Sequence, residues 1–463
     1  MVNFLLPITF FSKTYSYSVA EPMAMVSFPF MIIVILIQLY RFPNRIKNLI
    51  PTPKAFFLAA FVWFFQLLAM FLSYRKTGET LVTWGLLHSP ITLAGWTLAV
   101  YIAWAVIQVT VITEKDEKQF IKAGIIGLLF YLIFVLFPQV FLTVHLNIFN
   151  DYVNLLAKFF EERWKSMPGY DFYSNGSYSA TQLRVNGFEP EASYLANLLS
   201  VTYIPILIGI TVTGQRIWLK INSTKLQLIF NVSITFIVLL ILIFAKTTTG
   251  ILAAIVDYFI WISWSRGALR KSILWIAFIG MIFLIAAYLK IGVIHNMLNQ
   301  FLFAKQGTDN RWGGTIGLAL TFLSHPILGV GTGFTSYFTI ENFPISASQN
   351  FEFQHVYSQT GFPILSEFLG WLSTFGMIIV IPALMLLVNL IARSFLIESQ
   401  LNGATPELVD QSWSRSLHIS FISMIILVLF SSIFIIRIYL WPYLLMFFFY
   451  RKHIMRLEEE LKQ

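Results

Sequence analysis

The feature that most constrains this chain is a series of apolar runs, each close to 20 residues long. They lie near residues 24–40, 55–74, 90–113, 121–145, 192–213, 225–244, 247–264, 271–289, 366–392, 417–434 and 438–450. About 20 apolar residues in a helix cross the hydrocarbon core of a bilayer. Only 11% of the 463 residues are charged, against about 25% in soluble proteins. The sequence therefore predicts an all-α polytopic membrane protein with about 11 (10–12) transmembrane helices.

The positions of Lys and Arg predict an orientation. One alternate set of loops carries 19 of the 31 Lys and Arg residues, at 41–54, 114–122, 214–225, 265–271, 393–415 and 451–463. The opposite set is about twice as long and carries the other 12. Because Lys and Arg concentrate in cytoplasmic loops, we expect the N-terminus outside and the C-terminus in the cytoplasm. The net charge of +9 then reflects topology, and we expect no nucleic-acid partner.

Two long stretches fall on the outer side in this topology. We expect a single membrane domain over residues 1–463, with large extracytoplasmic loops at 146–191 and 290–364 that contain short amphipathic or re-entrant helices. Long loops in compact proteins are usually functional. The sequence has no G-x-x-x-x-G-K-[ST] motif and no cysteine, and no His, Asp or Glu cluster has metal-ligand spacing. We therefore expect no ATP-driven transport, no bound metal and no cofactor.

The first outer loop contains an amphipathic pattern and then a group of charged residues. Apolar residues at helical spacing predict an amphipathic helix over 147–167, which lies on the outer leaflet or packs under a neighbouring loop. Arg184, Glu189 and Glu191 come directly before a span. The two glutamates suit the start of a helix, where the dipole favours anions, or they take part in chemistry.

The second outer loop contains a predicted short helix over 312–323 and then three glycines, Gly329, Gly331 and Gly333. These glycines indicate a close backbone approach, either to a substrate or within a compact turn. His355 follows, either as a solvated loop residue or as a general base near neutral pH.

Four cations lie at the predicted outer ends of spans, although most Lys and Arg residues lie in the predicted cytoplasmic loops: Arg184, Lys246, Arg311 and Arg437. Arginine matches phosphate oxygens with its planar fork, so these residues are candidates to bind a lipid-linked phosphate. The alternative is that they contact lipid headgroups or pair with Glu189, Glu191 or Glu367.

The order of these motifs resembles the O-antigen polymerase and O-antigen ligase superfamily of bacterial polysaccharide enzymes. The resemblance covers residues 180–390 and rests on Arg184-x-x-Gly187-x-Glu189-Pro190, Lys246-Thr-Thr-Thr-Gly250, Arg311, the three spaced glycines and SEFLGWLSTFG at 366–376. By this resemblance, Arg184, Arg311, Glu189 and His355 are candidate catalytic residues. Candidate substrate-binding residues are Lys246, Arg437, Glu191, Gly329, Gly331, Gly333, Ser366 and Glu367.

The resemblance implies a nucleotide-independent glycosyltransferase in a bacterial plasma membrane, with its active site outside. It would join undecaprenyl-pyrophosphate-linked oligosaccharide units into O-antigen, capsule or exopolysaccharide. Membrane lipids and a chain-length regulator protein are the further partners implied. Ligase-like members carry a His-Asn pair where this chain has Leu365 and Ser366, so polymerase is favoured over glycan transfer to lipid A core or protein. A flippase for the same lipid-linked sugars is the alternative from another class.

Overall fold

Helices form all the regular elements of the part of the chain that the structure describes. The computed structural model describes residues 28–163, 171–217, 223–290, 292, 308–350, 353–401, 410–434 and 440–462. Eight helical segments in these ranges are long and apolar enough to cross a membrane: Pro53–Thr77, Gly85–Thr110, Glu114–Thr143, Ala192–Thr213, Thr224–Phe244, Gly267–Lys290, Glu367–Leu401 and Gln411–Ile433. A polytopic membrane protein is therefore confirmed, while the number of eleven crossings stays a prediction.

Each predicted span coincides with a helix. The long helices are α1 (Phe28–Arg41), α2 (Pro53–Thr77), α3 (Gly85–Thr110), α4 (Glu114–Tyr131), α8 (Ala192–Leu198), α9 (Ile204–Thr213), α10 (Thr224–Phe244), α11 (Thr248–Trp264), α12 (Gly267–Lys290), α17 (Glu367–Leu401), α18 (Gln411–Phe434) and α19 (Leu440–Glu460). A π-helical turn, Leu132–Leu136, joins α4 to α5 (Phe137–Thr143), and another, Leu199–Tyr203, joins α8 to α9. The loops add α6 (Asn150–Phe160), α7 (Tyr178–Gln182), α14 (Thr308–Ser324), α15 (Thr335–Glu341) and α16 (Ser358–Thr360).

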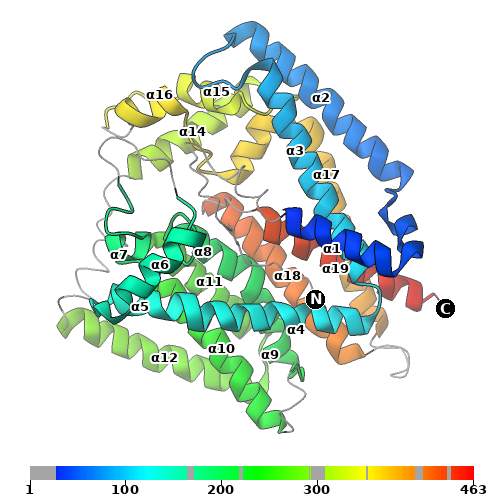
Figure 1. The fold of residues 1–463 in the computed structure, drawn as a ribbon, viewed down its shortest axis with the longest axis vertical. Coiled ribbons are helices and arrows are strands. Elements are labelled where there is room, and N and C mark those ends of the chain that lie inside the picture. Colours follow the sequence, from blue (N-terminus) through cyan, green and yellow to red (C-terminus); the bar gives the residue numbers. More distant parts are fainter. Residues whose placement is uncertain are drawn as a thin grey trace.

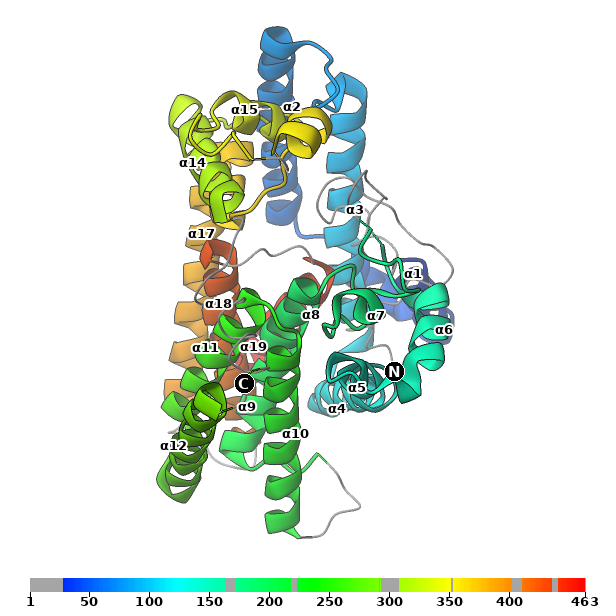
Figure 2. The same ribbon diagram turned by 90° about the vertical axis from the view of Figure 1, so that its left-hand side faces the viewer.

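The helices gather in two groups (Figure 1). In the upper group, α2, α14 and α15 surround the first half of α17, and in the lower group α8 to α12 pack near α18 (Figure 2). The lower group contains the largest core, in which α9 packs closely on α18. The segment α8–α9 is the most enclosed of the candidate spans. The short helices α6 and α7 lie together on the left in Figure 1, and α16 lies above them, beside α15 in the upper group.

A buried ion network fixes the other end of this core. The Glu117 carboxylate at the start of α4 accepts hydrogen bonds from Arg456 Nε (2.8 Å) and Nη2 (2.9 Å). It also contacts His453 Nδ1 at 3.0 Å and Trp413 Nε1 at 3.2 Å. Because Glu117 is only 1% exposed, the Arg456 guanidinium, the His453 imidazole and the Trp413 indole replace the water it loses. The network joins α4, α18 and α19.

The helix α17 is interrupted in its middle, and the glycine-rich segment fills the interruption. Gly376 has a φ of 64°, so the backbone leaves the helix there. Met377 N donates to Pro326 O at 2.9 Å and Ile378 N to Ile327 O at 3.1 Å. In return, the carbonyls freed by the break accept the backbone amides of residues 330 and 331 at 2.8 and 3.0 Å. The segment therefore replaces the helical hydrogen bonds lost at Gly376.

The three glycines of this segment lie inside the fold. A Cβ at Gly329 would lie 2.6 Å from the Ser373 carbonyl oxygen, and one at Gly331 would lie 2.8 Å from Met70 N. A Cβ at Gly333 would lie 2.3 Å from Ser89 Oγ. The structure thus gives these glycines a packing role against α2, α3 and α17. This is the compact-turn alternative from the sequence, and a substrate-binding role of the three glycines stays a prediction.

Replacing Gly376 with alanine tests this packing. A Cβ there would lie 2.2 Å from the Ile327 carbonyl oxygen, and the positive φ disfavours an L side chain, at a cost of about 1–3 kcal/mol before the overlap is counted. We expect Gly376→Ala to lower the melting temperature of the detergent-purified protein by several degrees. Gly280→Ala, in α12 with open space around it, is the control. Equal melting temperatures for the two variants would contradict the packing role.

Candidate functional site

The loop that carries Arg184 is held in place by a buried glutamine. Gln139 on α5 donates to Gly187 O at 2.8 Å, and its Oε1 accepts the amides of Asn186 (3.2 Å) and Gly187 (2.8 Å). Val185 N donates to Phe244 O, at the end of α10, at 3.2 Å. Gly187 has a φ of 65°, and a Cβ there would lie 1.9 Å from Tyr131 Oη. This loop, residues 183–190, is therefore fixed to two membrane helices.

Arg184 and Lys246 lie next to one another at this end of the bundle. The Arg184 guanidinium hydrogen bonds to the Tyr178 hydroxyl. Lys246 occupies the turn between α10 and α11 with a φ of 47°, and its Nζ donates to Thr143 O at 2.7 Å. Burial lowers the pKa of Lys246, and the positive charge of Arg184 lowers it further. The cluster therefore brings two cationic side chains within electrostatic reach of one another.

Glu191 and Tyr178 complete this cluster. Burial raises the pKa of Tyr178 to about 12, and the charge of Glu191 adds to the rise while Arg184 opposes it. Glu191 occupies the N-cap position of α8, with extended backbone, and its carbonyl accepts the amide of Tyr194 at 3.2 Å. Glu191 therefore lies at the start of α8 without a side-chain capping hydrogen bond, and its carboxylate lies near the Tyr178 hydroxyl.

Glu189 lies beneath the loop, beside a second buried carboxyl that the sequence did not single out. Glu162 and Glu189 are each 1% exposed, and neither carboxyl has a hydrogen-bond partner among the described residues. Burial raises the pKa of Glu162 to about 8. Burial and then the charge of Glu162 raise the pKa of Glu189 well above its usual value. Glu189 is thus an enclosed carboxyl whose surroundings favour its protonated form, and it does not reach solvent.

A third glutamate links the loop to α6. Glu161 Oε1 accepts the backbone amide of Tyr178 at 3.0 Å and the Asn186 side-chain amide at 3.1 Å, while its Oε2 accepts Arg163 Nε at 3.1 Å. In addition, Glu162 N donates to Phe188 O at 2.9 Å. The end of α6 is therefore tied to the same loop that carries Arg184.

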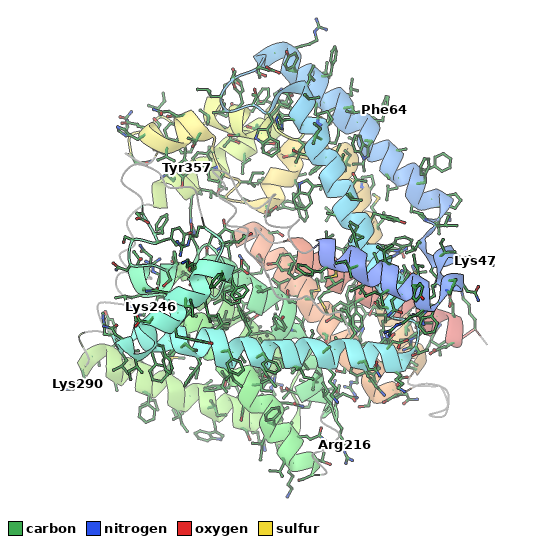
Figure 3. All side chains as sticks on the ribbon, in the orientation of Figure 1. Lys47, Phe64, Arg216, Lys246, Lys290 and Tyr357 are labelled. Carbon is green, nitrogen blue, oxygen red and sulfur yellow. The ribbon has the colours of Figure 1, made fainter. Side chains whose placement is uncertain are left out.

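The second long loop contributes residues from several elements. His355 is exposed and lies in a π-helical turn, Phe353–Tyr357, and Arg311 lies in the first turn of α14. The Tyr357 side chain is close enough to Tyr194 of α8 to interact with it electrostatically. Figure 3 shows Tyr357 and Lys246 on the same side of the molecule, away from Lys47 and Arg216. The two long loops thus lie on one face of the bundle.

The remaining candidates lie at the start of α17 or outside the described residues. Ser366 is 4% exposed, and its carbonyl accepts Gly370 N at 2.8 Å, so it occupies the N-cap position of the helix. Glu367 lies in the first turn of α17, where the positive end of the helix dipole stabilises a carboxylate. Arg437 lies outside the described residues. The contacts of Ser366 and Glu367 thus include a helix-start role that the sequence pattern did not predict.

One polar contact lies deep in the lower group. Asp257 on α11 is fully buried, and its Oδ1 accepts Ser200 Oγ at 2.9 Å. Ser200 belongs to the π-helical turn Leu199–Tyr203, and π-turns within helices are frequent at functional sites. Within the described residues, no group of three or more His, Cys, Asp or Glu side chains could hold a metal ion.

Sequence reasoning did not identify Gln139, Tyr178 or Glu162. For Gln139 the sequence did contain a signal, because it is a polar residue within an apolar run, and a polar residue in a span usually faces a partner inside the protein. Tyr178 and Glu162 carry no such signal, because their role depends on how the loop folds back. No protein-family model matches the chain. A search of curated proteins also finds no match.

The buried carboxyl pair predicts a dependence of stability on pH. Glu162 ionises near its usual pKa of 4.5 in the unfolded chain and near 8 in the folded chain. Between these values the folded state binds more protons, so stability falls as pH rises. We expect Glu162→Gln to raise the melting temperature little at pH 5 and most at pH 8.5. The gain in the free energy of unfolding at pH 8.5 is expected to be on the order of a few kcal/mol.

The measurement is thermal unfolding of the parent and of Glu162→Gln in detergent from pH 5 to pH 9. Asp151→Asn is the matched control, because Asp151 is an exposed carboxyl on α6, the helix that precedes Glu162. A pH profile for Glu162→Gln that parallels the parent would contradict the assignment of Glu162 as a buried acid.

Proposed function

We propose that this chain is a membrane glycosyltransferase that joins lipid-pyrophosphate-linked oligosaccharide units outside a bacterial plasma membrane, with its N-terminus outside and its C-terminus in the cytoplasm. The observation that carries the proposal is the adjacent pair Arg184 and Lys246, at the end of the bundle shared by both long loops. A lipid pyrophosphate presents its charge at the membrane surface, where these cations lie beside the outer ends of α10 and α11.

In the proposed reaction, a sugar hydroxyl of one lipid-linked unit attacks the anomeric carbon of the growing chain on another. The new glycosidic bond forms as the bond between the anomeric carbon and the pyrophosphate oxygen breaks. The lipid pyrophosphate leaves with the electron pair, and the hydroxyl proton passes to a base or to a phosphate oxygen. Arg184 and Lys246 would stabilise the charge that develops on the leaving group, which is typically the largest catalytic contribution.

The two candidates for the base differ in access. His355 is exposed on the second loop and can meet a substrate hydroxyl, whereas Glu189 is enclosed beside Glu162. We therefore assign the base role to His355 and a positioning role to Glu189. Arg311 is the second cation proposed to contact pyrophosphate or glycan, from α14.

Removing either cation of the pair is expected to impair elongation. A fixed cation aimed at developing charge contributes a few kcal/mol, so Arg184→Ala and Lys246→Ala should each slow chain extension about 100-fold or more. Arg184→Lys should recover part of the rate, because it keeps the charge and loses the fork. Lys290→Ala, an exposed lysine on the same side in Figure 3, should extend chains at the parent rate.

The assay uses purified protein in detergent with a lipid-linked repeat unit, and product lengths are resolved on a gel. Parent-like rates for both Arg184→Ala and Lys246→Ala would overturn the assignment. Extension only when lipid A core is the acceptor would identify a ligase. Absence of any extension in detergent, with movement of the lipid-linked sugar across sealed vesicles, would identify a flippase.

A further inference from the structure

The helix α6 presents an apolar stripe to the outside of the molecule. Tyr152, Leu155 and Phe159 on α6 follow Ile148, which lies in the 3-10 turn Asn147–Phe149 that leads into this helix, at intervals of four, three and four residues. The side chains of Ile148, Tyr152, Leu155 and Phe159 are 78%, 38%, 55% and 38% exposed. At 3.6 residues per turn these positions lie on one face. The opposite face packs inward, where Val153 and Ala157 are 2% and 4% exposed. The first long loop therefore carries a helix with its more extended apolar face turned away from the core.

This stripe continues the outer surface of a membrane helix. Phe130, Ile133, Phe134 and Phe137 on the segment Glu114–Thr143 are 60%, 58%, 50% and 55% exposed. Tyr152 Oη donates to Phe134 O at 3.0 Å, and the rings of Phe141 and Phe149 meet edge to face at 5.2 Å. These contacts join the two apolar surfaces. Lipid covers the exposed surface of Glu114–Thr143, because this segment is long and apolar enough to cross a membrane.

Charged residues border the stripe along one side. Asp151 and Lys158 are both exposed and lie about a quarter turn from the apolar positions. A helix with an apolar face, a charged flank and low overall hydrophobicity is typical of the membrane interface. At the membrane interface the Asp151 and Lys158 charges stay in water while the stripe meets lipid. If another protein covered the stripe, the position of these charges along its edge would mark no such boundary between water and lipid.

We propose that α6 is an interfacial membrane helix, whose stripe is covered by phospholipid acyl chains at the end of the bundle that contains Lys246. The length of α6, eleven residues, suits a helix that lies in the interface and not one that crosses it. The stripe and the outward face of Glu114–Thr143 then form one lipid-covered surface.

This placement has a consequence for the candidate site. The end of α6 is tied to the Arg184 loop through Glu161 and the backbone of Glu162. A helix anchored in the interface therefore fixes the depth of Arg184 relative to the headgroups. This consequence rests on the proposed function, because the depth of Arg184 is important only if Arg184 must contact a lipid pyrophosphate at the membrane surface.

The chain contains no cysteine, so single cysteine variants can carry one spin label each. Leu155→Cys and Phe159→Cys report the stripe, and Lys158→Cys reports the charged flank. The labelled proteins are placed in nanodiscs of plain phospholipid, and collisions with oxygen and with a water-soluble nickel chelate are measured. We expect labels at Leu155 and Phe159 to favour oxygen severalfold over the chelate, and the label at Lys158 to favour the chelate.

Chelate access at Leu155 equal to that at Lys158 would overturn the proposal, because the stripe would then face water. Low access to both reagents at Leu155 would also overturn it, because a second copy or another protein would cover the stripe. Ile148→Cys provides a further stripe position if one variant fails to fold, and melting temperatures identify such a failure. An oxygen preference at the stripe, combined with no chain extension by the parent protein, would keep the interfacial helix and reject only the proposed function.

Discussion

The constraint on which this structure most depends is that backbone amides and carbonyls in apolar surroundings must find partners within the chain. Helices satisfy this requirement along most of the molecule. Where α17 breaks at Gly376, the segment that begins at Pro326 supplies the missing donors and acceptors. Where the loop 183–190 meets α5, Gln139 does the same with its side chain. Both irregular segments are thus held as firmly as a helix.

The fold class and the helices could be predicted from the sequence, because their signal is local. An apolar run such as 192–213 specifies a helix by its length and composition alone, and the structure has helical segments over Ala192–Thr213. The break in α17 was not predictable in this way. Gly376 is one glycine among several in an apolar run, and its φ of 64° depends on pairing with a segment about 50 residues earlier. Such non-local pairing leaves no periodicity in the chain.

The candidate site was predictable in part, for a related reason. Arg184 and Lys246 could be found because they depart from the Lys and Arg bias of the side on which the predicted topology places them. The environment of Glu189 could not be found. The same residue pattern suits a solvent-facing base and an enclosed acid, and the difference depends on Glu162, which reaches it from the end of α6. The helix predicted over 147–167 also stops at Phe160, because Glu161 adopts an extended backbone and turns its carboxylate to the loop.

The cation pair is costly for the folded protein, and this cost bears on its role. Lys246 has a backbone conformation that L side chains rarely adopt, and its ammonium is partly buried beside a second cation. A residue held in such a region costs about 1–3 kcal/mol and is found mostly at functional sites. A hydrophobic turn between α10 and α11 could be built without a lysine in that conformation. Under the proposed function, the charge of a lipid pyrophosphate would offset this repulsion, in addition to the Glu191 carboxylate that lies near the Tyr178 hydroxyl.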